Sequence, residues 1–378
     1  MITRFAFPTN VLFGPGAVGE IGALVKGSGG TVALIVSDPG VVGAGLVAPV
    51  QRSLEAAGLF SVLHDGVAPN PLEENVETGA ALFRQEGCDF VIGVGGGSAL
   101  DAAKAIRLRI THSRPLIDYD DNAGGGELIR SDMPRMIAVP TTAGTGSEVG
   151  RSAVIICRAN QRKTVIFSPH LMPSYAVCDP EMTVGMPPPI TAATGMDALT
   201  HNIEAFLSTP YHPLADAIAL YGARLCAENL ARAVESGQDR EARANMMMAA
   251  MMGATAFQKG LGVTHSLAHP LSSVAGIHHG LANAILLPHV LEFNASACQS
   301  RYRDLSRTLN VPDASGALSE WVRELNRKIG IPAALGEVGV GRDMIAAMVP
   351  KAMEDGCHLN NPRPCSAEDM RALYQAAF

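Results

Sequence analysis

The first half of the chain alternates short apolar runs with segments of helical spacing. Residues 31–38 (TVALIVSD) and 89–94 (DFVIGV) are apolar, and residues 72–87 between them have helical spacing. Continuous apolar runs that are separated by helices are typical of parallel strands buried on both faces. The same pattern predicts further strands at 135–140, 152–157 and 174–179. We therefore expect an open α/β domain in this half.

The pattern changes at residues 186–191 (MPPPIT), where three consecutive prolines occur. Such a run breaks regular structure, although proline can open a helix at its first turn. Beyond it, residues 214–234 and 242–257 are rich in Ala, Leu and Met at helical spacing. We expect an α/β N-terminal domain over residues 1–185 and an all-α C-terminal domain over residues 186–378.

Composition and charge narrow the class of protein. A chain of 378 residues favours two domains, and 47% hydrophobic with 17% charged residues is typical of a globular protein. The net charge of −7 favours a small-molecule partner, because nucleic acids and anionic membranes need clustered Lys and Arg.

Cysteine usage and the terminal segment bear on location. The seven cysteines are scattered without a CxxC spacing, which indicates reduced thiols rather than a disulfide framework. The first residues lack the apolar core of a signal peptide, and no apolar run is long enough to cross a bilayer. We expect a cytoplasmic protein.

A glycine-rich turn follows the apolar run that ends near residue 94. Gly95, Gly96, Gly97 and Ser98 lead directly into a segment with helical spacing. Glycines let the backbone approach a ligand closely, and the N–H groups of a helix start can bind a pyrophosphate. A GxGxxG fingerprint is absent, so a simple tight turn is the alternative.

A second polar loop, residues 139–149 (VPTTAGTGSEV), follows another predicted strand and carries Thr141, Thr142 and Thr145. Polar loops at the carboxyl ends of parallel strands line the ligand crevice of open α/β sheets. Asp38 also ends a predicted strand, where a carboxylate could bind the adenosine ribose and favour NAD over NADP. An N-cap role is the alternative for Asp38.

Histidines gather in the predicted helical half. Asp197 and His201 are four residues apart and share a helix face, as do His265 and His269. Residues 262–289 hold five of the eleven histidines, including His279, in an apolar stretch. Buried carboxylate and imidazole groups need compensation, which Fe²⁺ or Zn²⁺ can provide through O and N ligands. A core ion pair is the alternative.

Several long motifs in order make the chain resemble the iron-containing (group III) alcohol dehydrogenase family. They are GVGGGSALDAAKAI, PTTAGTGSEV, ATGMDALTHNIEAF, GLGVTHSLAHPL and HHGLANAILLPHVLEFN. The resemblance implies an N-terminal dinucleotide-binding α/β domain and a helical metal-binding domain, the architecture of dehydroquinate synthase-like proteins, with the active site between the two. It also implies Fe²⁺, with Zn²⁺ possible, NAD, and a homodimer or higher homo-oligomer.

The resemblance also implies roles for individual residues. Asp197, His201, His265 and His279 would bind the metal, and His269 would lie beside it and assist proton transfer. The residues implied in cofactor binding are Asp38, Asn70, Gly95, Gly96, Gly97, Ser98, Asp101, Thr141, Thr142 and Thr145.

The chain departs from the family pattern near the expected substrate pocket. It has Gly150 and Arg151 after SEV, where many members carry Thr, and Lys259 where many have a neutral residue. Two cations could hold a carboxylate of an anionic hydroxy acid. In the alternative, Arg151 points to solvent and Lys259 makes a structural contact. The substrate candidates are Arg151, Ser152, Phe257 and Lys259.

The expected reaction is reversible hydride transfer between a primary or secondary alcohol and NAD. The alternative is an NAD- and metal-dependent lyase of the dehydroquinate synthase type, which would require a pocket crowded with Lys and Arg. The Ala- and Met-rich composition of residues 214–257 disfavours that alternative.

Overall fold

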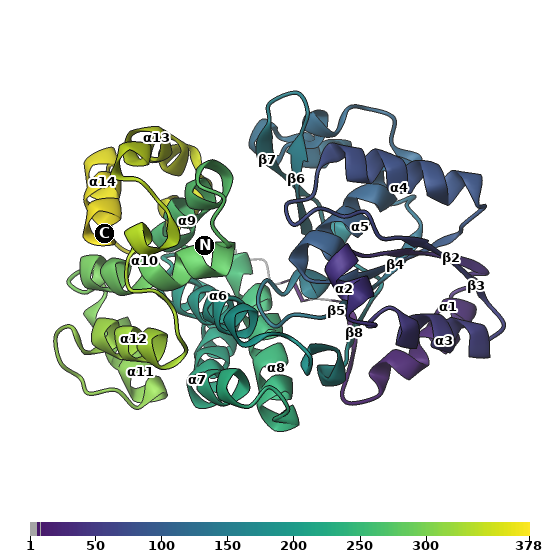
Figure 1. Ribbon diagram of the computed structural model, residues 1–378. Coiled ribbons are helices and arrows are strands. Elements are labelled where there is room, and N and C mark those ends of the chain that lie inside the picture. The colour runs from purple at the N-terminus through teal and green to yellow at the C-terminus, as the bar shows by residue number, and fades with distance from the viewer. Residues whose placement is uncertain (1–5, 8) are drawn as a thin grey trace. The chain divides into compact units, whose positions relative to one another are not determined.

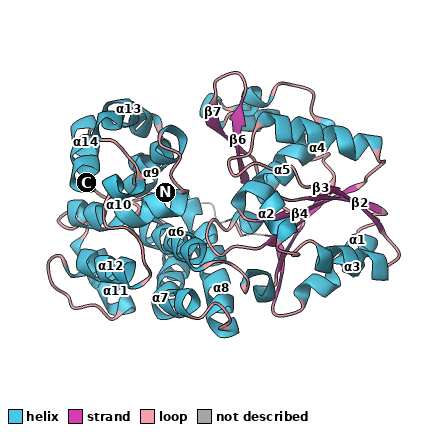
Figure 2. Cartoon of the chain, viewed as in Figure 1, coloured by secondary structure: helices cyan, strands magenta, loops and turns pink. Residues whose placement is uncertain are grey.

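The computed structural model of the chain describes residues 6, 7 and 9–378 (Figure 1). Contacts divide it into two compact units. One unit comprises Phe7–Thr142 and Gly146–Gly185, and it contains every strand of the described residues. The other contains Met186–Phe378 together with the short segment Ala143–Thr145, and it is helical (Figure 2).

The first unit is built on a six-stranded sheet in which all neighbouring strands are parallel. The spatial order is β1 (Asn10–Phe13), β8 (Tyr175–Cys178), β5 (Arg135–Pro140), β4 (Phe90–Gly95), β2 (Val32–Val36) and β3 (Phe60–His64). The predicted parallel strands within 31–38, 89–94, 135–140 and 174–179 are confirmed. The two edge strands, β1 and β3, were not predicted, because their residues are only partly buried and lack a continuous apolar run.

Helices cover both faces of this sheet (Figure 1). Alternate residues of one strand enter different cores, so Leu34 packs with α4 and α5 whereas Ile35 packs with α1 and α3. The helices are α1 (Ile21–Gly27), α2 (Pro39–Gly43), α3 (Ala48–Ala56), α4 (Glu73–Gln85) and α5 (Gly97–Thr111). Two-sided burial explains why the central strands are apolar throughout.

One strand prediction was wrong in its pairing. Residues 152–157 do form a strand, β6 (Ser152–Cys157), but it pairs antiparallel with β7 (Arg162–Phe167) in a separate two-stranded sheet. Its burial alternates between buried and half-buried positions, unlike that of a strand covered on both faces. The short link between β6 and β7 permits only a hairpin, since a parallel crossover needs a dozen or more residues.

The helical unit begins with α6 (Pro188–Leu207), which has prolines in its first turn and is buried along almost its whole length. The helices predicted at 214–234 and 242–257 are confirmed as α7 (Pro213–Glu235) and α8 (Arg240–Ala256), which both pack on α6. The remaining helices are α9 (Val263–Val274), α10 (His279–Asn294), α11 (Gln299–Leu309), α12 (Ala317–Lys328), α13 (Ile345–Glu354) and α14 (Ala367–Ala376).

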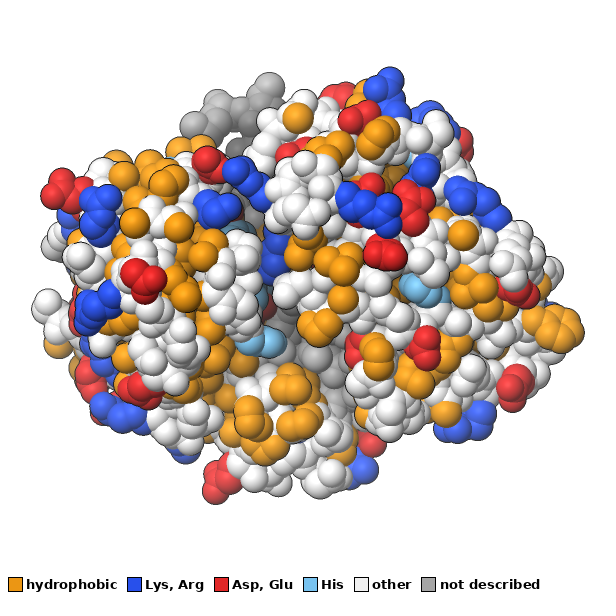
Figure 3. All heavy atoms as spheres, turned by 45° about the horizontal axis from the view of Figure 1, so that its top comes forward, with side chains coloured by type: hydrophobic (Ala, Val, Ile, Leu, Met, Phe, Trp, Pro, Cys, Tyr) orange, Lys and Arg blue, Asp and Glu red, His pale blue; other side chains and the backbone are white. Residues whose placement is uncertain are grey.

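The surface carries side chains of both charges. On the face drawn in Figure 3, Lys and Arg side chains lie among Asp and Glu side chains and form no continuous positive patch. Among the described helices, none has the length and apolar character required to span a membrane.

Candidate functional site

Helix α6 presents Asp197 and His201 from the interior of the helical unit. The two residues are one helical turn apart, and their side chains are almost fully buried. The Asp197 carboxylate oxygen Oδ1 lies 3.9 Å from Nε2 of His201. Helix α6 is therefore the element that places an acidic group and an imidazole in an apolar core.

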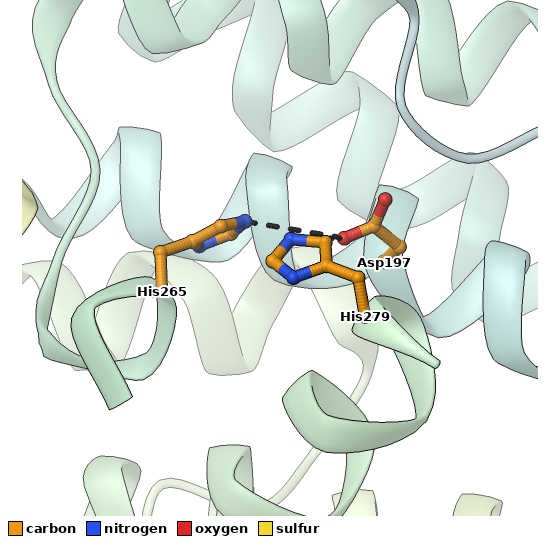
Figure 4. A group of neighbouring side chains, drawn as sticks. All are labelled: Asp197, His265 and His279. Atoms are coloured by element: carbon orange, nitrogen blue, oxygen red, sulfur yellow. Dashed lines mark ion pairs between the residues drawn. The ribbon is translucent and has the colours of Figure 1, made fainter. Parts of the chain in front are cut away.

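Helices α9 and α10 bring two more imidazoles to the same carboxylate. Nε2 of His265 lies 3.9 Å from Asp197 Oδ1, and Nε2 of His279 lies 3.5 Å from it. One ligand atom from each of Asp197, His265 and His279 lies within 4.8 Å of the other two (Figure 4). His201 joins this group through Asp197 and by stacking on His265, with ring centroids 4.6 Å apart.

A glycine permits the close approach of α10 to α6. Gly280 follows His279, and a Cβ atom there would overlap the Ala193 carbonyl oxygen of α6. Asn283, one turn after His279, donates a 2.8 Å hydrogen bond from Nδ2 to Asp197 Oδ1. Helix α10 is thus held against α6 at the level of the histidines.

Burial and proximity set the charges of these groups. Burial alone would raise the pKa of Asp197, but His201 and His279 oppose that effect, and the pKa falls to about 2. Burial lowers the pKa of His201 to about 4 and that of His279 well below its usual value. At neutral pH, Asp197 is therefore an anion beside neutral imidazoles.

These residues fit a divalent transition-metal ion. One carboxylate oxygen and three imidazole nitrogens form the mixed O,N donor set that suits Fe²⁺ and Zn²⁺. Ligands must be deprotonated before they bind a cation, and the low pKa values of Asp197, His201 and His279 meet that requirement. A simple ion pair accounts for the site less well, because the lowered pKa values of His201 and His279 leave both imidazoles uncharged beside Asp197.

His269 lies beside this group. Its ring stacks on that of His279, with centroids 5.1 Å apart, and its side chain is 38% exposed. Nδ1 of His269 is 2.7 Å from Oδ2 of Asp355, and Ser266 and the Cys357 amide donate to the other oxygen of that carboxylate. Asp355 therefore fixes the orientation of His269.

Sequence reasoning missed three polar partners of these histidines. Glu204 and Asn283 carried a signal, since each lies one helical turn from a predicted ligand, His201 and His279 respectively. No sequence pattern pointed to Asp355, because 86 residues separate it from His269. Only the packing of the segment after α13 brings it to α9.

In the α/β unit, the glycine-rich turn ends β4 and starts α5. Gly95 has a φ of +153°, and a Cβ atom there would lie 2.6 Å from that of Ala99 and 3.3 Å from Asp38 Oδ2. A Cβ on Gly96 would lie 3.3 Å from Thr142 Oγ1. The turn thus needs glycine, and it brings Asp38 and Thr142 to the N-terminus of α5, where Gly97 is the first helical residue.

Other predicted cofactor residues have contacts within the protein. Asp38 caps α2 by accepting hydrogen bonds from the amides of Gly40 and Val41. Ser98 donates to the Pro69 carbonyl, and Asp101 accepts hydrogen bonds from Ser147 and from the Val154 amide. Asn70 is exposed, Thr141 is buried, and Thr142 and Thr145 are half-buried.

Of the four predicted substrate residues, Lys259 and Phe257 lie in the helical unit, and Arg151 and Ser152 lie in the α/β unit. Lys259 is buried, and its Nζ contacts Asp216 Oδ1 at 2.5 Å and donates to the Phe206 carbonyl, the structural contact of the alternative interpretation. Phe257 lies against His201, with ring centroids 5.2 Å apart. In the other unit, Arg151 packs its guanidinium over the Phe167 ring, and Ser152 begins β6.

Comparison with known proteins adds independent information. The profile described as iron-containing alcohol dehydrogenase matches residues 8–180, and the profile of the C-terminal part of the Fe-containing alcohol dehydrogenase family matches residues 191–378. A 4-hydroxybutyrate dehydrogenase of Cupriavidus necator is 44% identical over 355 residues, which are 91% of this chain and 92% of that protein.

Two solved structures are similar to this chain over its whole length. A 1,3-propanediol oxidoreductase has a TM-score of 0.95 and 36% identity over the whole of both chains. A sulfoacetaldehyde reductase of Bifidobacterium kashiwanohense, solved in complex with NAD⁺, has a TM-score of 0.92 and 30% identity, covering 100% of this chain and 99% of that one.

These matches do not favour the lyase alternative. Both halves match profiles of metal-dependent alcohol oxidoreductases, and the relatives with full-length similarity bear names of that activity. The chain belongs to the iron-containing alcohol dehydrogenase family.

Proposed function

We propose that the protein catalyses the reversible oxidation of a small alcohol by NAD⁺, at a metal held by Asp197, His201, His265 and His279. The observation that supports this proposal most strongly is the convergence of three imidazoles from α6, α9 and α10 on one buried carboxylate. Fe²⁺ is the ion that the family name suggests, and Zn²⁺ suits the same donors. When bound, the ion would supply Lewis acidity that lowers the pKa of an alcohol hydroxyl.

The protein's own residues then orient groups and move protons. Phe257 lies against the His201 ring, where we propose that it limits the access of water. His269 is the residue through which we propose that the hydroxyl proton leaves. The partly exposed ring and the Asp355 hydrogen bond at Nδ1 support this role, since the bond leaves Nε2 available to exchange a proton.

For the cofactor, we propose that the turn of Gly95, Gly96, Gly97 and Ser98 binds the pyrophosphate at the N-terminus of α5. Asp38 would lie at the adenosine ribose, where a carboxylate favours NAD over NADP. Its position next to Gly95 supports this assignment, and the NAD⁺ complex of the sulfoacetaldehyde reductase gives a precedent within the family. Asn70, Thr141, Thr142 and Thr145 complete the proposed cofactor site.

For the substrate, we propose a short hydroxy acid such as 4-hydroxybutyrate, with Arg151 as the partner of its carboxylate. Among the described residues, no acidic side chain forms an ion pair with Arg151, which leaves its charge available. The name of the Cupriavidus necator relative agrees with this class of substrate. Lys259 is removed from the proposal, because Asp216 already neutralises it.

We also propose a cytoplasmic location and a homodimeric or higher assembly, as the family resemblance implies. The experiment that tests the function adds Fe²⁺ and NAD⁺ to protein purified without oxygen and follows NADH absorbance with a panel of alcohols and hydroxy acids. NADH formation that requires both metal and alcohol supports the proposal. A protein that takes up the ion but forms no NADH with any member of the panel would refute it.

A further inference from the structure

Glu204 is a buried acid on α6 that faces the N-terminus of α9. Its side chain is 4% exposed, and it lies one turn beyond His201. Oε1 accepts a 2.7 Å hydrogen bond from the Thr264 amide. Oε2 accepts from the Gly262 amide at 3.0 Å and lies 2.6 Å from Nδ1 of His265. Gly262 has to be glycine for this contact, since a Cβ there would lie 2.8 Å from Oε1.

All three neighbours of this carboxylate act as hydrogen-bond donors. The two amides can only donate, and the negative charge of Glu204 requires that Nδ1 of His265 donates as well. A neutral imidazole that is protonated at Nδ1 has its lone pair at Nε2. Glu204 therefore selects one of the two tautomers of His265.

The selected tautomer is the one that a metal ligand needs at Nε2. Without Glu204, His265 could carry its proton on Nε2 and donate a hydrogen bond from there to Asp197. Nε2 would then have no lone pair with which to bind a metal. The observed separation of 3.9 Å between Nε2 and Asp197 Oδ1 is too long for such a hydrogen bond. Nε2 of His265 therefore points towards the Asp197 carboxylate but makes no hydrogen bond with it.

We propose that Glu204 is a positioning residue of the metal site, which holds His265 in its metal-binding tautomer and orientation. This inference rests on the proposed metal site and adds the group that prepares one of its ligands. Carboxylate partners of this kind fix the ring and increase the basicity of ligating histidines, and their removal typically weakens metal binding by about 10- to 100-fold.

The variant Glu204→Gln tests the role, because an amide has only one acceptor atom. If its oxygen serves the Gly262 amide and His265, its NH₂ group faces the Thr264 amide, and donor meets donor. If the group turns over, its NH₂ faces Nδ1 and imposes the wrong tautomer. We expect the dissociation constant for Co²⁺, measured by chelator competition on metal-free protein, to rise about 10- to 100-fold, and the visible Co²⁺ spectrum to change.

The matched control is Asp216→Asn, which removes another carboxylate of the helical unit, one whose ion pairs are with Lys259 and Arg301 and not with any of the four ligands. It should bind Co²⁺ within about twofold of the wild-type protein. Equal losses in both variants, or an unchanged dissociation constant in Glu204→Gln, would overturn the proposal. Wild-type protein that binds no Co²⁺ would instead refute the metal site itself.

A second measurement does not depend on the folding of the variant. In metal-free wild-type protein labelled with ¹⁵N-histidine, His265 should show a protonated Nδ1 with a strongly hydrogen-bonded proton. The signal is assigned by its loss in His265→Gln. A proton on Nε2 instead of Nδ1 would overturn the role of Glu204 even if the variant could not be purified.

Discussion

Nδ1 of His269 lies 2.7 Å from a carboxylate oxygen of Asp355, and both side chains are half-buried. Burial opposes ionisation of Asp355, but the hydrogen bond and charge of His269 outweigh it and hold the pKa of this carboxyl far below its usual range. Asp355 is therefore ionised at neutral pH and accepts the Nδ1 proton. The pair leaves Nε2 of His269 as the atom that can exchange a proton.

Removing the charge of Asp355 should slow the reaction without releasing the metal. In Asp355→Asn the side chain no longer holds the His269 tautomer, so we expect kcat to fall about 10- to 100-fold, within the usual contribution of a positioned proton carrier. Metal content, measured by elemental analysis, should not change. A variant with wild-type kcat would show that His269 needs no such partner.

The stability of the metal-free protein should fall as the pH falls from about 6.5 to about 4. His201 is buried as a neutral imidazole with a pKa of about 4, below the ordinary histidine pKa of 6.5 that applies in an unfolded chain. The unfolded chain therefore takes up the proton first, and stability present above 6.5 is lost towards 4, on the order of 3 kcal/mol for this group. Urea denaturation across this pH range measures the loss.

His279 contributes in the same direction, whereas His265, whose pKa is raised through Glu204 despite its burial, partly offsets the loss. The comparison protein is His201→Asn, in which the pH dependence should be shallower. A wild-type profile that stays flat between pH 6.5 and 4 would contradict the buried neutral state of His201.

The packing of α10 on α6 should control metal affinity through Gly280. In Gly280→Ala the new Cβ would overlap the Ala193 carbonyl and move His279 away from Asp197, so we expect a loss of about 1 to 3 kcal/mol in stability and weaker metal binding. Gly336→Ala is the control, since its Cβ would meet only Phe378 at an ordinary distance of 3.8 Å. Thermal unfolding with and without Co²⁺ separates the two variants, and equal behaviour would exclude the packing argument.

We expect Arg151, and not Lys259, to bind the carboxylate of an anionic substrate. Arg151→Met should lower kcat/KM for 4-hydroxybutyrate by about tenfold or more, the value of one charge-assisted hydrogen bond, and leave that for butanol nearly unchanged. Lys259→Met breaks the contact with Asp216 and should affect both substrates to the same extent. Equal efficiency of the wild-type protein towards the two compounds would remove the anionic-substrate proposal.

Periodicity predicted most of the α/β sheet, because the central strands are buried nearly throughout and their apolar runs are continuous. It predicted the long helices α7 and α8 from their helical spacing. It failed where burial is partial, at the edge strands β1 and β3 and in the pairing of β6 with β7. Helical spacing indicated Asp197 with His201, and family resemblance added His279. Neither could reveal Asp355, whose contact with His269 depends on tertiary packing alone.

The central claim is that Asp197, His201, His265 and His279 bind one catalytic ion. The most direct measurement titrates metal-free protein with Fe²⁺ in the absence of oxygen, while NADH formation from an excess of alcohol and NAD⁺ is followed. The account predicts uptake of one ion per chain, activity that rises in proportion to occupancy, and loss of both in Asp197→Asn. Activity that is independent of added iron, or iron uptake that persists in Asp197→Asn, would contradict it.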